Sequence, residues 1–302
     1  MKRIIAVLSI ALAGIVELVD AQSFYNFRTG RDVIASVGTG TSTYFGDLKD
    51  PGDYMDAKPN LNIGLQYFFH SRIAGRAELH WFRLQGDDSD SELTGKTRRN
   101  LSFRSDNFEL DLIGIVNAFP QGARFYQRPQ FNPYGFIGIG LLYFNPKGQV
   151  PQTDWNEDPL PDAGDYIALQ PLRTEGVDYN RLAIVIPFGI GVKYKANPFI
   201  NIGLEGGYRL TFTDYLDDVS TVYQLHSSIE DPLVQAMADR RHEIDLPPLG
   251  IDEGHIRGNP ANNDGYFLFN IKIEYYLPEN ILSVNSKNRG KGPRRNIQRR
   301  RR

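Results

Sequence analysis

The chain has 302 residues, of which 41% are hydrophobic and 12% aromatic, and this excludes a wholly disordered protein. It contains no cysteine, which excludes disulfides, thiolate metal sites, cysteine nucleophiles and lipid attachment through an N-terminal cysteine. The formal net charge is −2, but positions 279–302 hold nine Lys and Arg residues and a single acid. A strongly basic tail therefore follows an acidic body.

The first residues are typical of a secretory signal peptide. Lys2 and Arg3 precede an apolar run over 4–16, and Val19 and Ala21 suit the positions before a cleavage site. The run is shorter than the roughly 20 residues that a membrane-spanning helix needs. We therefore expect residues 1–21 to be removed on export and residues 22–278 to form the folded body.

Eight segments of alternating polar and apolar residues follow along the chain. They span residues 32–46, 59–71, 72–85, 101–118, 132–145, 181–195, 199–213 and 264–277. Most exceed the five or six residues that are usual in soluble sheets, and they are long enough for tilted strands that cross a membrane, which need roughly 9–11. The alternation alone does not separate a soluble sandwich from a barrel whose apolar face meets lipid.

The connections between these segments alternate in length, and this favours the barrel. The short or intermediate ones are 70–72, 119–131 and 196–198, and the long ones are 47–58, 86–100, 146–180 and 214–263. An even strand number, with short turns at one end and long loops at the other, is typical of outer-membrane barrels. We predict an all-β, eight-stranded antiparallel transmembrane barrel in the outer membrane of a Gram-negative bacterium. Its long loops would be extracellular, and its short turns and both termini periplasmic.

Ten charged residues are predicted to face the barrel interior: Arg72, Arg76, Glu78, Glu109, Asp111, Lys193, Glu205, Arg209, Lys272 and Glu274. An eight-stranded barrel leaves room only for side chains. Because an unpaired buried charge is costly, we expect the five cations and five acids to pair across strands and fill the interior. A path for protons or ions along these charges is the alternative.

The sequence offers no established motif for catalysis or cofactor binding. The last long loop contains three histidines that could meet a serine, as in a lipid-modifying barrel: His226, His242 and His255. Nothing in their spacing requires such a pair, so we expect no enzymatic activity and no cofactor.

Acidic residues in the same loop offer oxygen ligands for calcium, namely Asp214, Asp217, Asp218, Asp252 and Glu253. Their spacing is not that of an EF-hand, so we expect a solvated acidic surface and no metal site. The loop is also expected to contain one short helix, because Asp231 can cap it and Pro232 suits its first turn.

The basic tail over 279–302 is expected to be disordered when free and to lie in the periplasm. Its Arg-rich end is a candidate partner-binding segment, formed by Arg294, Arg295, Arg299, Arg300, Arg301 and Arg302. Nucleic acid is absent from the periplasm, so an acidic protein, anionic lipid or peptidoglycan-associated partner is expected. A solubilising tail without a partner is the alternative.

Three separated parts of the chain carry a family resemblance. They are Tyr44-Phe45-Gly46-Asp47-Leu48, Phe212-Thr213-Asp214-Tyr215-Leu216-Asp217-Asp218-Val219-Ser220, and Arg257-Gly258-Asn259-Pro260 with Asp264-Gly265-Tyr266-Phe267. Together they resemble the PorG-like family of outer-membrane barrels of Bacteroidota, over most of the mature chain. The resemblance implies a type IX secretion component that associates with a periplasmic ring of PorK- and PorN-type proteins, without an enzymatic site. A generic structural barrel with no dedicated partner and, less favoured, a lipid-modifying enzyme are the alternatives.

Overall fold

The computed structural model describes residues 32–50, 57–122, 124–249 and 254–278. The predicted signal peptide over 1–21 and the basic tail over 279–302 lie outside these residues, as do Asp252 and Glu253.

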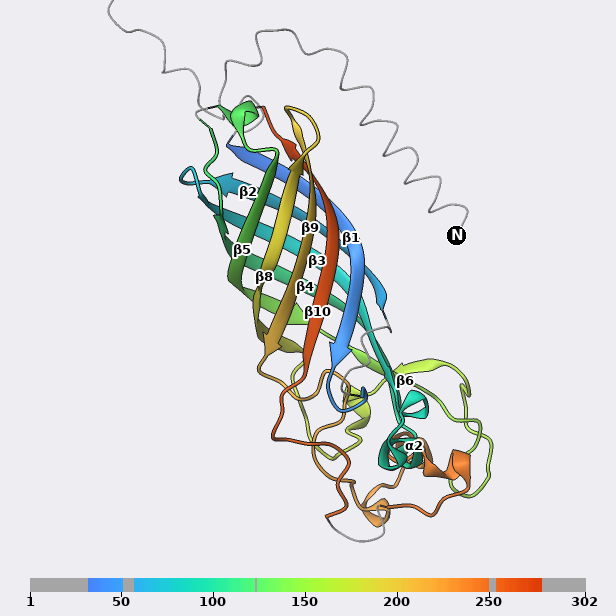
Figure 1. Cartoon of the computed structure of the whole chain (residues 1–302). Coiled ribbons are helices and arrows are strands. Elements are labelled where there is room, and N and C mark those ends of the chain that lie inside the picture. The colour runs from blue at the N-terminus through green and yellow to red at the C-terminus, as the bar shows by residue number, and fades with distance from the viewer. Residues whose placement is uncertain (1–31, 51–56, 123, 250–253, 279–302) are drawn as a thin grey trace, which may run out of the picture.

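Eight long antiparallel strands close into a barrel, which confirms the predicted fold (Figure 1). They are β1 (Val33–Phe45), β2 (Lys58–Phe68), β3 (Ile73–Asp87), β4 (Ser102–Asn117), β5 (Phe131–Tyr143), β8 (Leu182–Lys195), β9 (Ile200–Thr211) and β10 (Gly265–Tyr276). Their order around the ring is β3-β2-β1-β10-β9-β8-β5-β4, and pairing of β3 with β4 closes it. Each corresponds to one of the eight predicted segments.

The polarity of the barrel is the inverse of that of a soluble protein, and β4 shows it most clearly. Phe108, Leu110 and Leu112 point outward and are 50–62% exposed, whereas Glu109 and Asp111 between them point inward and are fully buried. The same alternation places exposed Ile, Leu, Val, Phe and Tyr side chains on the outer face of the wall. A continuous apolar belt therefore surrounds a polar interior, as lipid outside the wall requires.

The two ends of the barrel differ. The turns between β2 and β3, β4 and β5, and β8 and β9 lie at the end where β1 begins and β10 finishes, hereafter the turn end (Figure 1). At the other end the long loops fold into a cap, formed by residues 46–50, 88–101, 144–181, 212–249 and 254–264. In the described part of the chain, no helix is long and apolar enough to cross a membrane.

Short elements give the cap its shape: η2 (Asp88–Asp90), α2 (Thr94–Arg99), β6 (Pro146–Gln149), β7 (Tyr166–Ala168), η4 (Gln170–Leu172), η5 (His226–Ser228), α3 (Pro232–Ala238) and η6 (Arg241–Ile244). A further short element, η3 (Phe125–Gln127), lies at the turn end. The predicted helix is confirmed as α3, because the Asp231 carboxylate accepts a hydrogen bond from the Leu233 N–H at 2.9 Å. Strands β6 and β7 were not predicted.

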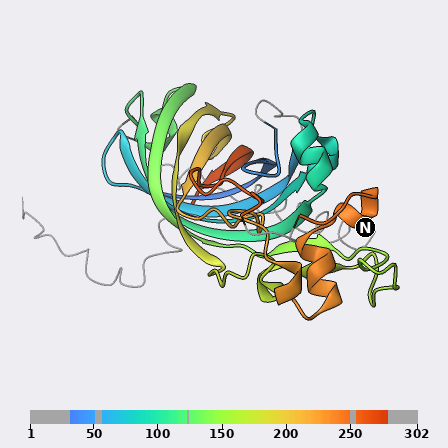
Figure 2. The ribbon, with the colours of Figure 1, turned by 90° about the horizontal axis from the view of Figure 1, so that it is seen from below.

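The β3–β4 hairpin carries the cap on one side of the barrel. Its ladder runs without a break from Ile73↔Val116 near the turn end to Asp87↔Ser102 in the cap. Beyond the barrel rim, β4 pairs with β6 and β6 with β7, so the sheet continues into the cap. Figure 2 shows that the helical part of the cap lies to one side of the barrel opening.

Apolar clusters close the interior at both ends. The largest lies between the barrel mouth and the cap, and it includes Tyr44, Phe82 and Tyr266 of the barrel with Leu216 and Met237 of the cap. Two smaller clusters lie nearer the turn end, around Ile115 and Phe136 and around Ile34 and Tyr276. The charged middle of the barrel is thus enclosed between apolar layers.

Candidate functional site

The barrel interior holds nine of the ten charged residues that were predicted to face it, each at most 3% exposed. They are Arg76, Glu78, Glu109, Asp111, Lys193, Glu205, Arg209, Lys272 and Glu274. Arg72 was assigned wrongly. It precedes β3, its side chain is exposed in the turn, and its carbonyl accepts a hydrogen bond from the Asn117 N–H at 2.8 Å.

Four of these residues form a closed square of ion pairs across the barrel. The Arg76 guanidinium lies 2.6 Å from Glu205 and 3.0 Å from Glu78, and the Lys272 ammonium lies 2.6 Å from each of the same carboxylates. The Tyr134 hydroxyl donates a further hydrogen bond to Glu205 at 2.7 Å. Two cations and two acids from β3, β9 and β10 therefore neutralise each other and connect distant parts of the wall.

A separate pair lies nearer the turn end. The Lys193 ammonium on β8 lies 2.8 Å from the Glu274 carboxylate on β10 and donates a hydrogen bond to Gln66 at 2.9 Å. Asn201 donates a hydrogen bond to the same Glu274 carboxylate at 2.9 Å. This pair is also neutral.

A third group is not balanced. The Arg209 guanidinium lies 3.3 Å from Glu109 and 4.0 Å from Asp111, and the Tyr266 hydroxyl donates a hydrogen bond to Glu109. One cation therefore faces two acids. The fully buried His80 lies beside them, with its Nε2 atom 3.5 Å from both Glu78 and Asp111.

The sequence-based charge count did not include His80, although the alternation through Arg76 and Glu78 places it on the same inward face. With Arg72 in the turn, the predicted residues that do face the interior are four cations and five acids, besides this histidine. The buried Arg128, which was not predicted, adds a cation at the turn end, where its Nε donates a hydrogen bond to Asn201 at 2.7 Å. The pairs are fixed across the barrel and their side chains are buried. This arrangement fills the lumen and fits a closed interior better than a conducting path.

At the barrel mouth, the three segments that carry the family resemblance meet. The Tyr44 hydroxyl lies 2.6 Å from the Asp217 carboxylate and 2.8 Å from the Asp264 carboxylate. Because one hydroxyl can donate only one hydrogen, one of the two carboxyls must itself carry a proton to complete this pair of bonds. The Asp47 carboxylate accepts a hydrogen bond from the Asn259 N–H at 2.6 Å.

Four acidic residues at the barrel mouth, hereafter the mouth cluster, are buried: Asp214, Asp217, Asp218 and Asp264. The expectation of a solvated acidic surface is therefore wrong for Asp214, Asp217 and Asp218. Asp218 accepts hydrogen bonds from Thr174 at 2.5 Å and Tyr179 at 2.7 Å. The polar composition of the loop predicts that such residues are exposed to solvent. Their burial results from the tertiary packing of the cap.

Burial dominates the electrostatics of the mouth cluster. It raises the pKa of Asp217 to about 8 and the pKa of Asp214 to about 7. It raises the pKa of Asp264 well above its usual range, with a further contribution from the charge of Asp217. Burial also raises the pKa of Asp218 to about 6, against the opposing charge of Arg257.

The loop histidines form no serine dyad among the residues that the structure describes. Trp155 lies between two of them, with ring centroids 5.0 Å from His226 and 5.0 Å from His242. The His242 Nε2 atom lies 3.0 Å from the Thr153 carbonyl, and Ser228 donates its hydroxyl hydrogen to the Leu225 carbonyl. His255 is exposed. The His226 Nε2 atom also lies 3.8 Å from the Asp239 carboxylate.

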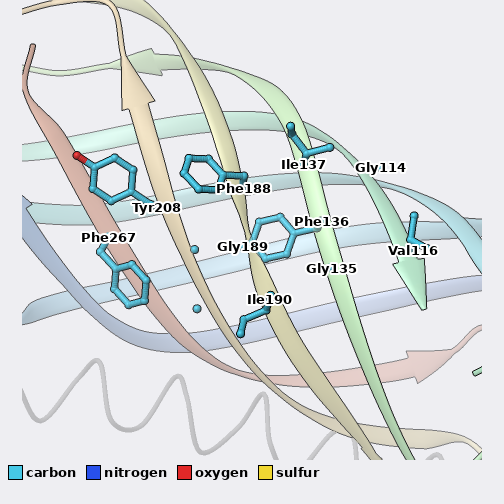
Figure 3. A pocket seen from close by; sticks show the side chains of 12 residues that line it. Gly114, Val116, Gly135, Phe136, Ile137, Phe188, Gly189, Ile190, Tyr208 and Phe267 are labelled. Carbon is cyan, nitrogen blue, oxygen red and sulfur yellow. The ribbon is translucent and has the colours of Figure 1, made fainter. Parts of the chain in front are cut away.

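An apolar hollow of about 660 Å³ lies on the outer wall across β4, β5, β8, β9 and β10 (Figure 3). It forms where outward positions are glycine, at Gly114, Gly135 and Gly206, between large apolar neighbours such as Phe188 and Ile190. It lies within the apolar belt and holds no charged residue.

Neither a protein-family model nor a curated protein matches the chain. Solved structures do resemble it. Neisserial surface protein A aligns with 81% of this chain and 97% of its own at 7% identity, with a TM-score of 0.41. The attachment invasion locus protein Ail of Yersinia pestis aligns with 82% and 99% at 10% identity, with a TM-score of 0.38. The outer membrane enzyme PagL aligns with 80% and 99% at 11% identity, with a TM-score of 0.30. At these identities the similarity concerns the barrel fold alone.

Proposed function

We propose that the chain is a non-enzymatic outer-membrane barrel that anchors a folded cap on one side of the membrane and a partner on the other. The observation that carries this proposal is the inverse polarity of the wall. An apolar belt of exposed side chains surrounds an interior of buried, paired charges. Only a lipid surrounding makes this arrangement favourable, because exposed apolar patches of this extent are rare on soluble monomers.

The interior supports an anchoring role over a transport role. The ion pairs join strands from different parts of the ring, and apolar clusters lie at both ends of the charged layer. A chain reconstituted in a planar bilayer should therefore show conductance near zero. Steady large-pore currents would refute the closed lumen.

The family resemblance supports a more specific role, as an accessory component of a type IX-like secretion system. The quoted segments are far apart in sequence, yet their residues Tyr44, Asp47, Asp217, Asn259 and Asp264 contact one another at the barrel mouth. Segments that meet in one structural unit support the resemblance better than identical residues scattered over the chain would. In this role the chain docks to PorK- or PorN-type periplasmic ring proteins, and the basic residues of 279–302 supply attraction to an acidic partner.

The role is tested by purification from the outer membrane of the native host. A tagged chain is expected to recover the ring proteins in mild detergent, and a chain truncated after residue 283 should recover fewer of them. The loss should be larger at low salt, because exposed charges are screened over about 8 Å at physiological ionic strength. A variant with Lys at 299–302 is the matched control, because it keeps the charge and loses bidentate Arg contacts.

Two outcomes would change the proposal. Equal recovery with and without the tail moves the docking surface to the turns at 119–131 and 196–198. Recovery of no ring protein by either form refutes the secretion role and leaves a structural barrel without a dedicated partner, which the filled lumen also fits.

A further inference from the structure

We propose that the barrel interior binds one divalent transition-metal ion between His80, Glu109 and Asp111, with zinc as the reference ion. One ligand atom of each side chain lies within 4.8 Å of those of the other two, and all three residues are fully buried. This proposal revises the expectation from the sequence that the chain has no metal site.

The charges around Arg209 are not balanced. The square of Arg76, Lys272, Glu78 and Glu205 is neutral, and so is the Lys193–Glu274 pair. The remaining group has a single cation, Arg209, for two carboxylates. This group therefore holds one more carboxylate than cations, beside His80, in an interior where uncompensated charge is costly. The buried Arg128 lies at the turn end, on Asn201, and no ion pair joins it to Glu109 or Asp111 in the described structure.

His80 and Asp111 also have polar atoms with unused hydrogen-bonding capacity. Both ring nitrogens of His80 and both carboxylate oxygens of Asp111 are buried without a well-formed hydrogen bond in the described structure, and their polar neighbours include the carboxylates of Glu78 and Glu109. Buried polar atoms are nearly always partnered, so four such atoms on two adjacent side chains point to something that binds there. The Glu109 oxygens accept hydrogen bonds from Arg209 and Tyr266, so a bound ion would share the Glu109 carboxylate with these two groups.

His80 and Asp111 lie at a separation that suits two ligands of one ion. The His80 Nε2 and Asp111 Oδ2 atoms are 3.5 Å apart, and Nε2 is equally far from Glu78 Oε2. Two ligands on a tetrahedral zinc ion with bonds of about 2.1 Å lie roughly 3.4 Å apart. The carboxylate has room because β5 presents Gly140 there, where a Cβ atom would lie 2.1 Å from Asp111 Oδ1.

The donor set selects the class of ion. One imidazole nitrogen with two or three carboxylates suits zinc and similar first-row ions, whereas magnesium and calcium prefer oxygen ligands alone. Arg209 lies 3.3 Å from Glu109 beside the site, and its positive charge favours a single bound ion over two. Because the ligands are enclosed, the ion has to enter while the barrel folds.

The experiment uses the mature full-length chain refolded from urea into detergent micelles with zinc chloride, with magnesium chloride or with a chelator. After removal of free ions, metal content is measured by mass spectrometry. We expect about one zinc ion per chain and no retained magnesium. Cobalt in place of zinc should give visible absorption bands typical of nitrogen and oxygen coordination.

Two variants remove ligands with little change of shape, His80→Gln and Asp111→Asn. Each should weaken zinc binding by more than the about 10–100-fold that loss of an outer-shell partner costs. His70→Gln, which changes an exposed histidine in the β2–β3 turn, should bind like the wild type. Heat-modifiable migration on gels identifies the chains that have folded.

The wild-type measurement decides the matter even if both variants fail to fold. A folded wild-type chain that takes up no zinc overturns the proposal and leaves a proton as the missing positive charge. Zinc retained in full by folded His80→Gln also overturns it, because the ion then lies elsewhere. Equal retention of magnesium would contradict the assignment of an imidazole ligand.

Discussion

Replacing Glu205 by glutamine should destabilise the barrel strongly, because this carboxylate is the acceptor for three buried donors. It lies 2.6 Å from Arg76, 2.6 Å from Lys272 and 2.7 Å from the Tyr134 hydroxyl. Glu205→Gln keeps the volume, removes the charge and turns one acceptor into a donor. Two cations then share Glu78 alone, and breaking a buried pair in this way costs about 3–5 kcal/mol of unfolding free energy.

A second substitution separates charge imbalance from loss of packing. Arg76→Met alone should also destabilise, because it leaves two acids for Lys272. The double variant Glu205→Gln with Arg76→Met keeps the 2.6 Å pair of Lys272 and Glu78 and restores neutrality. Its loss of unfolding free energy should be smaller than the sum of the single losses by about 0.5–3 kcal/mol, the range for residues that share a network.

Urea unfolding of the micelle-bound barrel, followed by tryptophan fluorescence and checked by heat-modifiable migration, measures these free energies. Ile202→Val on the outer face of β9 is the matched control, and it should change little because Ile202 is 42% exposed. A free energy of unfolding for Glu205→Gln within about 0.5 kcal/mol of the wild-type value would show that the three contacts of Glu205 do not stabilise the barrel. Strictly additive losses in the double variant would refute the shared network instead.

Three further outcomes follow from the structure. Ile202→Lys should cost about 2–4 kcal/mol if its face meets the centre of the bilayer, as urea unfolding in lipid vesicles can measure. Because the pKa of Asp217 is raised to about 8 and that of Asp264 is also raised, the folded mouth binds more protons than the unfolded chain. The stabilisation of the folded mouth by this proton uptake should be fully present below about pH 4. It should fall by about 1.4 kcal/mol per pH unit per extra proton up to about pH 8. Hydrogen exchange of residues 212–220, corrected for the intrinsic rate, should therefore accelerate between pH 6 and 8.5, and unchanged protection would contradict this. A cysteine at Ser227 in the cap should be labelled by an impermeant reagent on intact cells and a cysteine at Pro198 should not; the reverse result would invert the orientation.

The sequence was sufficient to predict the eight strands because period-2 alternation is a local property. Each strand has its own alternation of apolar and polar residues, and the even count and loop lengths then imply a closed ring. The α3 helix was equally local, since Asp231 and Pro232 are adjacent to the residues that they start. Sequence also suggested which face of β4 is buried, without indicating what Glu109 contacts.

The parts that could not be predicted depend on contacts between distant residues. Arg72 continues the alternation of β3, but the strand begins one residue later, so its side chain leaves the interior. Strands β6 and β7 have few residues and form only because β4 extends beyond the barrel and offers them an edge. The sequence around Asp217 and Asp218 predicts exposed residues. Their burial depends on contacts with Tyr44 and Tyr179, which are far away in the chain.

The unbroken β3–β4 hairpin has a mechanical consequence. A force applied along the strands to the cap end of this hairpin pulls β3 and β4 in the same direction. It therefore acts in shear on the ladders to the neighbouring strands, from Asn60↔Phe82 to Phe68↔Ala74 on β2 and from Phe108↔Tyr143 to Asn117↔Tyr134 on β5. Bonds loaded together resist far more than bonds that are peeled apart one after another. A pull on the cap is therefore carried by β3 and β4 through the whole height of the wall to the turn end.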